Sequence, residues 1–394
     1  MASLASWACG AFDAEAPPPG VDPIEGGADV VSVPDGAATE AGACQLTPGV
    51  GPPQLRPEAG PPEVLCGSES VQLETSPKNC GACGRDCGPG VQCNVGLCVS
   101  TQIVDVGTDV FLQARAGDHV FVTNQSRAYE LALTGGTVPT ALLELEAGCC
   151  LGRIVTDDEA IYAMEANEHI WRRPIGPGAP ALLDVRRVGA ETLALTRNEA
   201  VFGNAGLGLV LAVDKRPGGG SARTISTAES GVRFIVADGD VVYWMRVPSW
   251  LDAAGLPSEI VRHDTASGDT RRSVALPHAQ ALAVDESFVY FYQGTTGEIR
   301  RMPKNLSGEG EVLGTWNDAP EARTHAHHIA LTADHVYVLI GTANAGARVI
   351  VRVPKCGGAP IPIFWSKFAP VSGPIIDDEN LYFSEGSTLR RVAP

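Results

Sequence analysis

Residues Ala281–Tyr290 read ALAVDESFVY, which is an apolar run, a turn that starts at Asp285, and a second apolar run that ends on an aromatic side chain. Apolar pairs that end in an aromatic residue recur along the chain after similar turns. The seven aromatic positions are Phe121, Tyr162, Phe202, Tyr243, Tyr290, Tyr337 and Tyr382, and successive ones lie 40 to 47 residues apart. A period of this length, filled with short β-type runs, indicates a repeat architecture.

The repeat around Tyr290 divides into four expected strands, which cover residues 281–284, 288–292, 298–302 and 311–314. Glycine-rich turns separate the third and fourth strands in five repeats, because hairpin turns favour residues that tolerate positive φ. These turns lie at residues 135–136, 176–178, 218–220, 308–310 and 357–358. The sequence therefore predicts an all-β chain whose main domain, residues 101–394, is a seven-bladed β-propeller.

The last repeat is too short to supply four strands. It contains apolar runs at residues 375–376, 381–383 and 389–392, and then the sequence stops. The run Gln102–Val106 precedes the first full repeat and has no partner of its own. We expect it to pair with the last blade and close the ring, because this arrangement leaves no open sheet edge.

Acidic residues gather in the turns that precede the aromatic positions. Short Asp side chains bond to their own backbone in such turns, so we interpret these acids as turn residues rather than as metal ligands or catalytic groups. They are Asp157, Asp158, Asp238, Asp240, Asp377 and Asp378.

A small cysteine-rich module is expected at residues 66–98. Six cysteines at this density indicate an oxidising compartment, where disulfides stabilise a segment too short to build a core. They are Cys66, Cys80, Cys83, Cys87, Cys93 and Cys98. Three disulfides are favoured over a zinc site, because no histidine lies nearby, and over a catalytic dithiol, because no βαβ pattern surrounds Cys80 and Cys83. Their connectivity stays open.

The other cysteines are Cys9, Cys44, Cys149, Cys150 and Cys356. Cys149 and Cys150 precede a first strand, whereas Cys356 lies in a turn between a third and a fourth strand, on the opposite face. We therefore do not expect Cys356 to pair with either of them. A bridge between Cys149 and Cys150 stays open, and Cys44 has no assigned role.

The sequence before the module predicts a tether. Residues 10–65 are rich in Pro, Gly and Ala, carry mostly acidic charge and show no apolar periodicity, so we expect a disordered linker. Residues 1–9 leave two interpretations open. They are either the remnant of a signal peptide whose lipobox places a lipid on Cys9, or a stray cysteine in a disordered tail.

The charge of the chain restricts its partners. The formal net charge is −17, with 46 acids against 29 bases, which argues against nucleic acid and against anionic membrane surfaces. No apolar run is long enough for a transmembrane helix, so membrane contact is expected only through a lipid on Cys9. We expect a monomer.

Two parts of the chain resemble proteins of one bacterial group. The run NCGACG at residues 79–84, with the cysteines that follow, resembles a cysteine-rich repeat of secreted myxobacterial proteins. The pieces Ala281–Asp285, Val242–Trp244 and Val353–Gly358 resemble propeller repeats of myxobacterial secreted proteins and lipoproteins. The resemblance implies an extracytoplasmic location, in the cell envelope or secreted, and says little about activity.

The channel mouth is the expected ligand site. Aligned on the aromatic positions, residues ten before them lie at the start of the strands that line the channel; these are Phe111, Gly152, Thr192, Arg233, Gln280, His327 and Ser372. Two long loops, residues 248–257 and 315–328, add aromatic and polar residues on the same face. The candidate ligand-binding residues are Arg233, Trp250, His278, Gln280, Trp316 and His327. The alternative is that these loops only pack their own tryptophans.

Histidines at residues 325–328 raise the question of a divalent metal. In an extended strand His325 and His327 share a face while His328 points away, which gives two candidate ligands. Two are too few without a carboxylate such as Glu321 or Asp318. No cofactor is expected, and a divalent metal at His325 and His327 is the exception that stays open.

Three functional hypotheses follow. The leading one is a non-enzymatic propeller that binds a protein, peptide or glycan at its mouth. The second is a metal-assisted lyase or hydrolase, because seven-bladed propellers that resemble the streptogramin lyases use a His, a Glu and a divalent metal near the channel. No matching His–Glu set is seen at the channel positions, only the histidines at residues 325–328. The third is a scaffold for envelope proteins.

Overall fold

The computed structural model describes residues 63–394 apart from short gaps, which are residues 125–126, 134–138, 145–150, 166–168, 176–177, 184–189, 205–206, 228, 230, 248–256, 317–323, 343–346, 368 and 378. The backbone of residues 144, 190, 191, 324, 325 and 342 is described without their side chains. The predictions for residues 1–62, including the linker and the lipid on Cys9, lie outside the described residues. So do those for Cys44, Cys149, Cys150 and Trp250.

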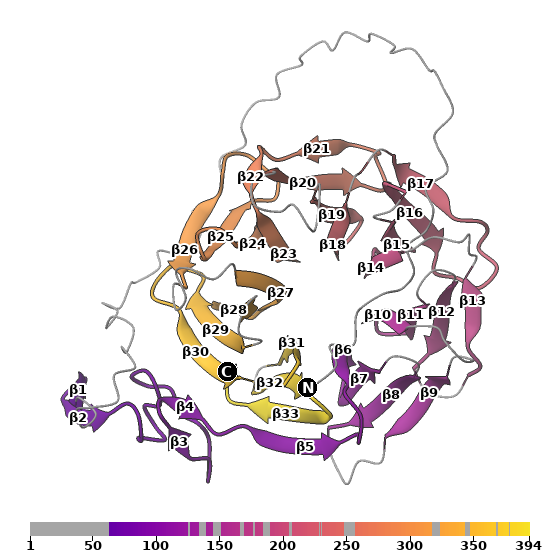
Figure 1. Cartoon of the computed structure of the whole chain (residues 1–394). Coiled ribbons are helices and arrows are strands. Elements are labelled where there is room, and N and C mark those ends of the chain that lie inside the picture. The colour runs from indigo at the N-terminus through magenta and orange to yellow at the C-terminus, as the bar shows by residue number, and fades with distance from the viewer. Residues whose placement is uncertain are drawn as a thin grey trace, which may run out of the picture. The chain divides into compact units, whose positions relative to one another are not determined.

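Seven antiparallel sheets, six of four strands and one of five, stand around a central axis, which confirms the predicted β-propeller (Figure 1). Within each blade, strands that follow one another in sequence are neighbours, and the first strand lies innermost. The first three blades comprise β6 (Phe111–Ala116), β7 (His119–Thr123), β8 (Arg127–Ala132) and β9 (Thr140–Glu144); β10 (Leu151–Thr156), β11 (Ala160–Glu165), β12 (His169–Pro174) and β13 (Ala181–Leu183); and β14 (Ala190–Leu195), β15 (Glu199–Asn204), β16 (Leu209–Asp214) and β17 (Arg223–Ser226).

The other four blades continue the same order. They comprise β18 (Val232–Asp238), β19 (Val241–Arg246), β20 (Pro257–Asp264) and β21 (Thr270–Arg272), with β22 (Leu276–Pro277) paired to β20; β23 (Ala279–Val284), β24 (Phe288–Gln293), β25 (Glu298–Pro303) and β26 (Glu311–Thr315); β27 (Thr324–Leu331), β28 (His335–Thr342), β29 (Arg348–Pro354) and β30 (Ile361–Ser366); and β31 (Val371–Ile376), β32 (Leu381–Glu385), β33 (Thr388–Val392) and β5 (Thr101–Asp105). No helix occurs among the described residues, and hence none that could cross a membrane.

The second strand of a blade is buried on both faces, because each sheet packs between two neighbours. In β24, Tyr290 and Tyr292 pack towards the sixth blade, while Val289 and Phe291 pack towards the fourth. All four side chains are inaccessible to solvent. Alternate residues thus serve two different interfaces, which explains why the run is continuously apolar.

In the third blade the register differs from the sequence alignment. Val201 pairs with Ala194 as Tyr290 pairs with Ala283, so Val201 takes the aromatic position and packs towards the fourth blade. Phe202, chosen from the sequence, faces the second blade instead. The alignment was wrong by one residue, because the sequence of an apolar pair does not show which of its two residues packs against the next blade.

The ring is closed by β5, as predicted. This strand runs antiparallel to β33, and its pairs include Val104 with Leu389 and Gln102 with Arg390. Ile103, Val104 and Val106 also pack into the apolar cluster shared by the first and last blades. The outer strand of the last blade therefore comes from the part of the chain that precedes the first blade.

The turn acids hold their own turns and also join adjacent blades. Asp285 Oδ1 accepts hydrogen bonds from the backbone N–H groups of Ser287 and Phe288. Its other oxygen accepts bonds of 2.6 Å from Tyr290 Oη and from Lys355 Nζ of the next blade. The turn role is likewise confirmed for Asp157 and Asp377.

The Asp–Lys contact between blades recurs wherever both residues are present. Each lysine directly follows the third strand of its blade and binds the turn acid of the preceding blade; the pairs are Lys215 with Asp157, Lys304 with Asp238 and Lys355 with Asp285. Thr196 and Thr332 hold the equivalent turns of the third and sixth blades through their hydroxyls. In the blades that follow these two, the fourth and the seventh, the residue directly after the third strand is Thr265 and Ala393, respectively, rather than lysine.

Three disulfides join the six cysteines of the module. They are Cys66–Cys83, Cys80–Cys93 and Cys87–Cys98, which settles the connectivity left open by the sequence. The module contains two hairpins, β1 (Glu63–Cys66) with β2 (Glu69–Gln72) and β3 (Cys93–Asn94) with β4 (Leu97–Cys98).

The module packs against the sixth and seventh blades. Cys80, Cys87 and Cys98 belong to the same buried cluster as Ile363 and Phe383 of those blades. The side chain of Arg85, only 3% exposed, donates from Nη1 to the carbonyl oxygen of Pro362 at 3.2 Å. Burial, followed by the charge of Arg352, lowers the pKa of Arg85 to about 10, which leaves it charged at neutral pH.

Cys356 lies in the turn between β29 and β30, as expected, and is disulfide-bonded. The six module cysteines pair among themselves, so the partner of Cys356 lies outside the described residues.

Ring closure can be tested with two truncated chains that both lack the module and differ only in β5. A chain that starts at Thr101 should fold as a closed ring, whereas one that starts at Gly107 exposes the edge of β33 and an apolar face. We expect its melting temperature to fall by about 5 °C or more, equivalent to about 2 kcal/mol. Calorimetry checks this, and equal melting temperatures would refute closure by β5.

The Asp285–Lys355 contact should appear in the acid dependence of stability. Burial raises the pKa of Asp285, but the bonds from Lys355, Tyr290 and the backbone lower it to about 2, against about 3.9 in an unfolded chain. Because the folded pKa is depressed, this stabilisation is fully present above about pH 4 and disappears as the pH falls towards 2. Lys355→Met should therefore lower the melting temperature at pH 6 and have a smaller effect near pH 3. The matched control is Lys78→Met, at an exposed module position; a pH-independent difference for Lys355→Met would contradict the assignment.

Candidate functional site

A cavity of about 450 Å³ lies among the inner strands of five blades. It is lined by Arg153, Thr192, Arg233, Phe234, Ile235, Val236, Ala237, Ala281, Leu282, Ala283, Val284, His327, His328, Ile329 and Leu331. These residues belong to β10, β14, β18, β23 and β27, which face the central axis (Figure 1). Its volume suits a small molecule or the end of a larger ligand.

Every first strand contains a register shift, and these shifts determine which side chains reach the cavity. In β27 the shift lies between Ala326 and His328. A bulge breaks the alternation of faces, so both His327 and His328 line the cavity. The expectation that His328 points away was wrong for this reason. The side chain of His325 is outside the described residues.

The described cavity lining has cationic and imidazole side chains and no carboxylate. Arg153 comes from the second blade, Arg233 from the fourth, and the two histidines from the sixth. Burial lowers the pKa of the Arg153 guanidinium. Burial, and then the positive charge of Arg153, lower the pKa of His328 to about 3, so this imidazole is neutral at physiological pH.

Three polar residues at the predicted mouth positions connect neighbouring blades. Thr192 Oγ1 accepts a hydrogen bond of 2.9 Å from the backbone N–H of Ile235, and Gln280 Oε1 accepts one of 2.8 Å from that of Ala326. Ser372 Oγ accepts the N–H of Leu112 at 2.6 Å. Each bond satisfies an inner-strand N–H of the next blade, so these side chains are engaged in holding the ring together.

Two other predicted residues, His278 and Trp316, are not among the residues that line the cavity. His278 is 8% exposed, and its Nδ1 lies 3.0 Å from Gln280 Nε2. Trp316 packs against the apolar cluster between the fifth and sixth blades. Of the predicted ligand-binding residues, the structure thus brings Arg233 and His327 together in the cavity, and their role in binding stays a prediction.

The predicted metal site at His325 and His327 gains no further ligand from the described residues. The one cluster of three or more potential ligands among them is Cys80, Cys87 and Cys98, and all three are in disulfides. A metal at the histidines therefore stays a prediction.

Arg153 was not among the residues predicted from the sequence, and His328 was expected to point away from the face shared by His325 and His327. Arg153 directly follows Gly152, the position taken by alignment for the second blade, and the register shift in β10 lies between Leu151 and Ile154. A basic residue beside the aligned position was the available signal. Without knowledge of the bulge, the alignment selected glycine instead.

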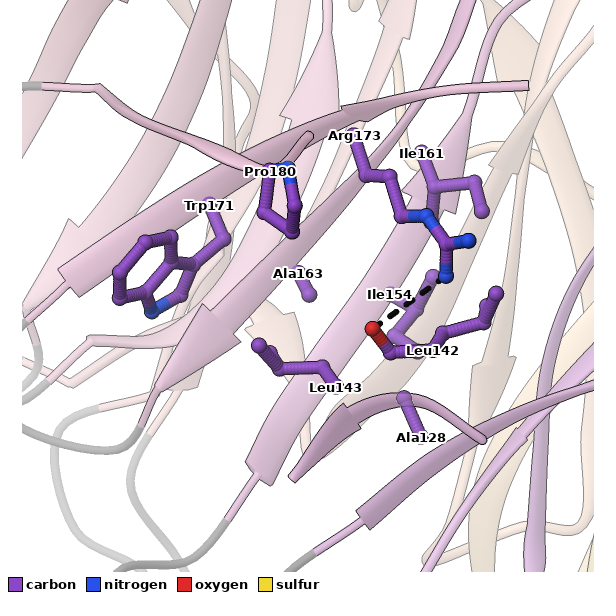
Figure 2. A pocket seen from close by; sticks show the side chains of 9 residues that line it. All are labelled: Ala128, Leu142, Leu143, Ile154, Ile161, Ala163, Trp171, Arg173 and Pro180. Carbon is purple, nitrogen blue, oxygen red and sulfur yellow. Dashed lines mark hydrogen bonds between the residues drawn. The ribbon is translucent and has the colours of Figure 1, made fainter. Parts of the chain in front are cut away.

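A second hollow lies between the first and second blades. Figure 2 shows it bounded by Leu142 and Leu143 on one side and by Trp171, Arg173 and Pro180 on the other. Arg173 Nη1 donates to the carbonyl oxygen of Leu142 at 3.2 Å across it. The volume is about 20 Å³, which is room for one water molecule, so this hollow is a packing gap rather than a ligand site.

No protein-family model and no curated protein matches the sequence. Among solved structures, a catalytically inactive variant of virginiamycin B lyase from Staphylococcus aureus, with quinupristin, is similar at a TM-score of 0.58 and 16% identity over 75% of this chain and 98% of that one. YCF48 bound to D1 peptide is similar at a TM-score of 0.55 and 10% identity, over 75% of this chain and 96% of that one. At these identities the likeness shows a common propeller fold.

The role of Gln280 can be separated from ligand binding. Gln280→Leu leaves the N–H of Ala326 without its acceptor, so we expect a loss of about 1–3 kcal/mol in the free energy of unfolding. The control is Gln102→Leu, at an exposed position of β5, which should change stability by less than about 0.5 kcal/mol. Urea denaturation measures both; equal stability of the two variants would show that the blade-to-blade bond contributes nothing.

Proposed function

We propose that this protein is an extracytoplasmic binding propeller that takes part of a protein or peptide partner into its channel. The observation that carries the proposal is the cavity of about 450 Å³, to which five blades contribute apolar walls and a few polar groups. Pockets that bind ligands commonly have this size and this mixture. YCF48, which has a similar fold, is bound to a peptide in its structure, and this supports a peptide as the first ligand class to test.

Three disulfides and the further one at Cys356 support the location outside the cytoplasm. Secretion, the lipid on Cys9 and the relationship to myxobacterial envelope proteins are part of this proposal. A module packed on the ring, preceded by an acidic linker, would present the channel at a distance from an anchored N-terminus.

Filling the channel should abolish binding. Ala237 lines the cavity, and Ala237→Trp adds a bulky ring there. We expect ligands found for the wild-type protein on peptide and glycan arrays to be lost by this variant. The control is Val274→Trp, at a position that is 47% exposed, and it should bind as the wild type does.

Melting temperatures of both variants must first show that they are folded. Retained binding by folded Ala237→Trp would place the ligand elsewhere and overturn the proposal. Glycan hits without peptide hits would replace the peptide as the ligand class, and silence on both arrays would favour a scaffold that uses its outer surface.

A further inference from the structure

Arg153 lines the cavity, and its guanidinium has no acidic partner among the described residues. Elsewhere even a fully buried acid is matched: Glu229, which is 0% exposed, bonds to Arg272 at 2.6 Å and to Arg246 at 3.0 Å. In contrast, the buried Nε of Arg153 has no hydrogen-bond acceptor, and no ion pair of Arg153 is found in the part of the chain that the structure describes. Arginine stays protonated under these conditions, so an uncompensated cation faces the cavity.

The groups around Arg153 add donors and no negative charge. Arg233 faces the same cavity from the fourth blade, and His328 faces it from the sixth. Because the pKa of His328 is lowered to about 3, this ring is neutral and offers one N–H donor and one acceptor. The described lining thus contains two guanidinium groups and two imidazoles, and it contains no carboxylate.

We infer that the channel contains an oxyanion site, in which Arg153, supported by Arg233 and His328, binds a carboxylate or phosphate group of the ligand. A guanidinium presents its N–H groups in a fork that matches the two oxygens of such a group. Five blades leave about 450 Å³, which is more space than one oxyanion fills, so the rest of the ligand extends along the apolar wall formed by Ala281–Val284.

The arrangement of charges is costly to the empty protein, which is the second argument for a ligand. A buried cation without a partner destabilises the folded state, and replacing it with an apolar side chain of similar size is often neutral or stabilising. An anion that binds only the folded ring offsets this penalty and stabilises the protein by mass action. We therefore expect Arg153 to contribute little to stability without a ligand and to gain a partner when an anionic ligand enters.

The inference rests on the proposed function only for the identity of the ligand to which the carboxylate or phosphate group belongs. The probes are therefore simple: inorganic phosphate, acetate, and a tripeptide with either a free or an amidated C-terminus, each titrated into the full chain at constant ionic strength. Melting temperature and calorimetric titration are the two measurements. Phosphate without acetate would identify a phosphorylated ligand, while acetate together with the free-acid tripeptide would identify a carboxylate.

We expect the wild-type melting temperature to rise with at least one of these anions. Arg153→Met should melt at the same or a higher temperature than the wild type without anion, and should lose about tenfold or more in anion affinity. Arg233→Gln should weaken binding less. Arg271→Gln, at an exposed position on the outside of the fourth blade, is the matched control and should respond as the wild type does.

Two results would overturn the site. One is an equal anion response in the wild type and in Arg153→Met. The other is a lower melting temperature of Arg153→Met together with no anion response in the wild type, since Arg153 would then serve the fold alone. If the wild type ignores all anions while Ala237→Trp still abolishes partner binding, the oxyanion site fails and the binding function stands. If anions bind at Arg153 but no partner is found on either array, the oxyanion site stands and the proposed binding of a peptide or glycan fails.

Discussion

The pairing of β5 with β33 is the constraint on which the rest of this structure depends. Each blade buries both of its faces against neighbours, as Phe291 and Tyr292 do on opposite sides of β24. A ring that failed to close would expose two apolar faces and the edge of β33. The closing strand begins at Thr101, shortly after Cys98, and the module that ends at Cys98 packs against the sixth and seventh blades. The strand that completes the last blade is thus connected by a short segment to a disulfide-linked module that packs on the same blade.

The features that the sequence predicted are those that depend on local alternation and on period. Strand runs such as Phe288–Gln293, the turn residues and the number of blades follow from residues close together in the chain. The unpaired run at residues 102–106 could be matched to the short last repeat by counting strands. The disulfide connectivity could not be predicted, because it depends on how the two hairpins of the module fold on one another.

The side-chain directions at the channel could not be predicted, because a bulge in each inner strand changes the face on which later residues lie. The bulges have no common sequence. They involve Phe234 and Ala281, which both have φ near +50°, and Gly373 in the last blade. For the same reason Gln280 was expected at the ligand, although its amide holds the next blade. The role of a polar residue here is decided by the backbone of its neighbour, which lies more than forty residues away in the chain.

The contacts between blades also sharpen the meaning of the charge of this protein. Its acids outnumber its lysines and arginines, and many of the basic residues form ion pairs. Lys215 and Lys355, for example, bind the turn acids Asp157 and Asp285 of the preceding blades. A cation that remains without an acid in the channel is therefore not a consequence of composition. The net charge of −17 argues against polyanionic partners such as nucleic acid, whereas the site proposed at Arg153 would bind a single oxyanion. The net charge of the protein and the proposed site at Arg153 together favour a ligand with a single anionic group whose remaining part is neutral or basic.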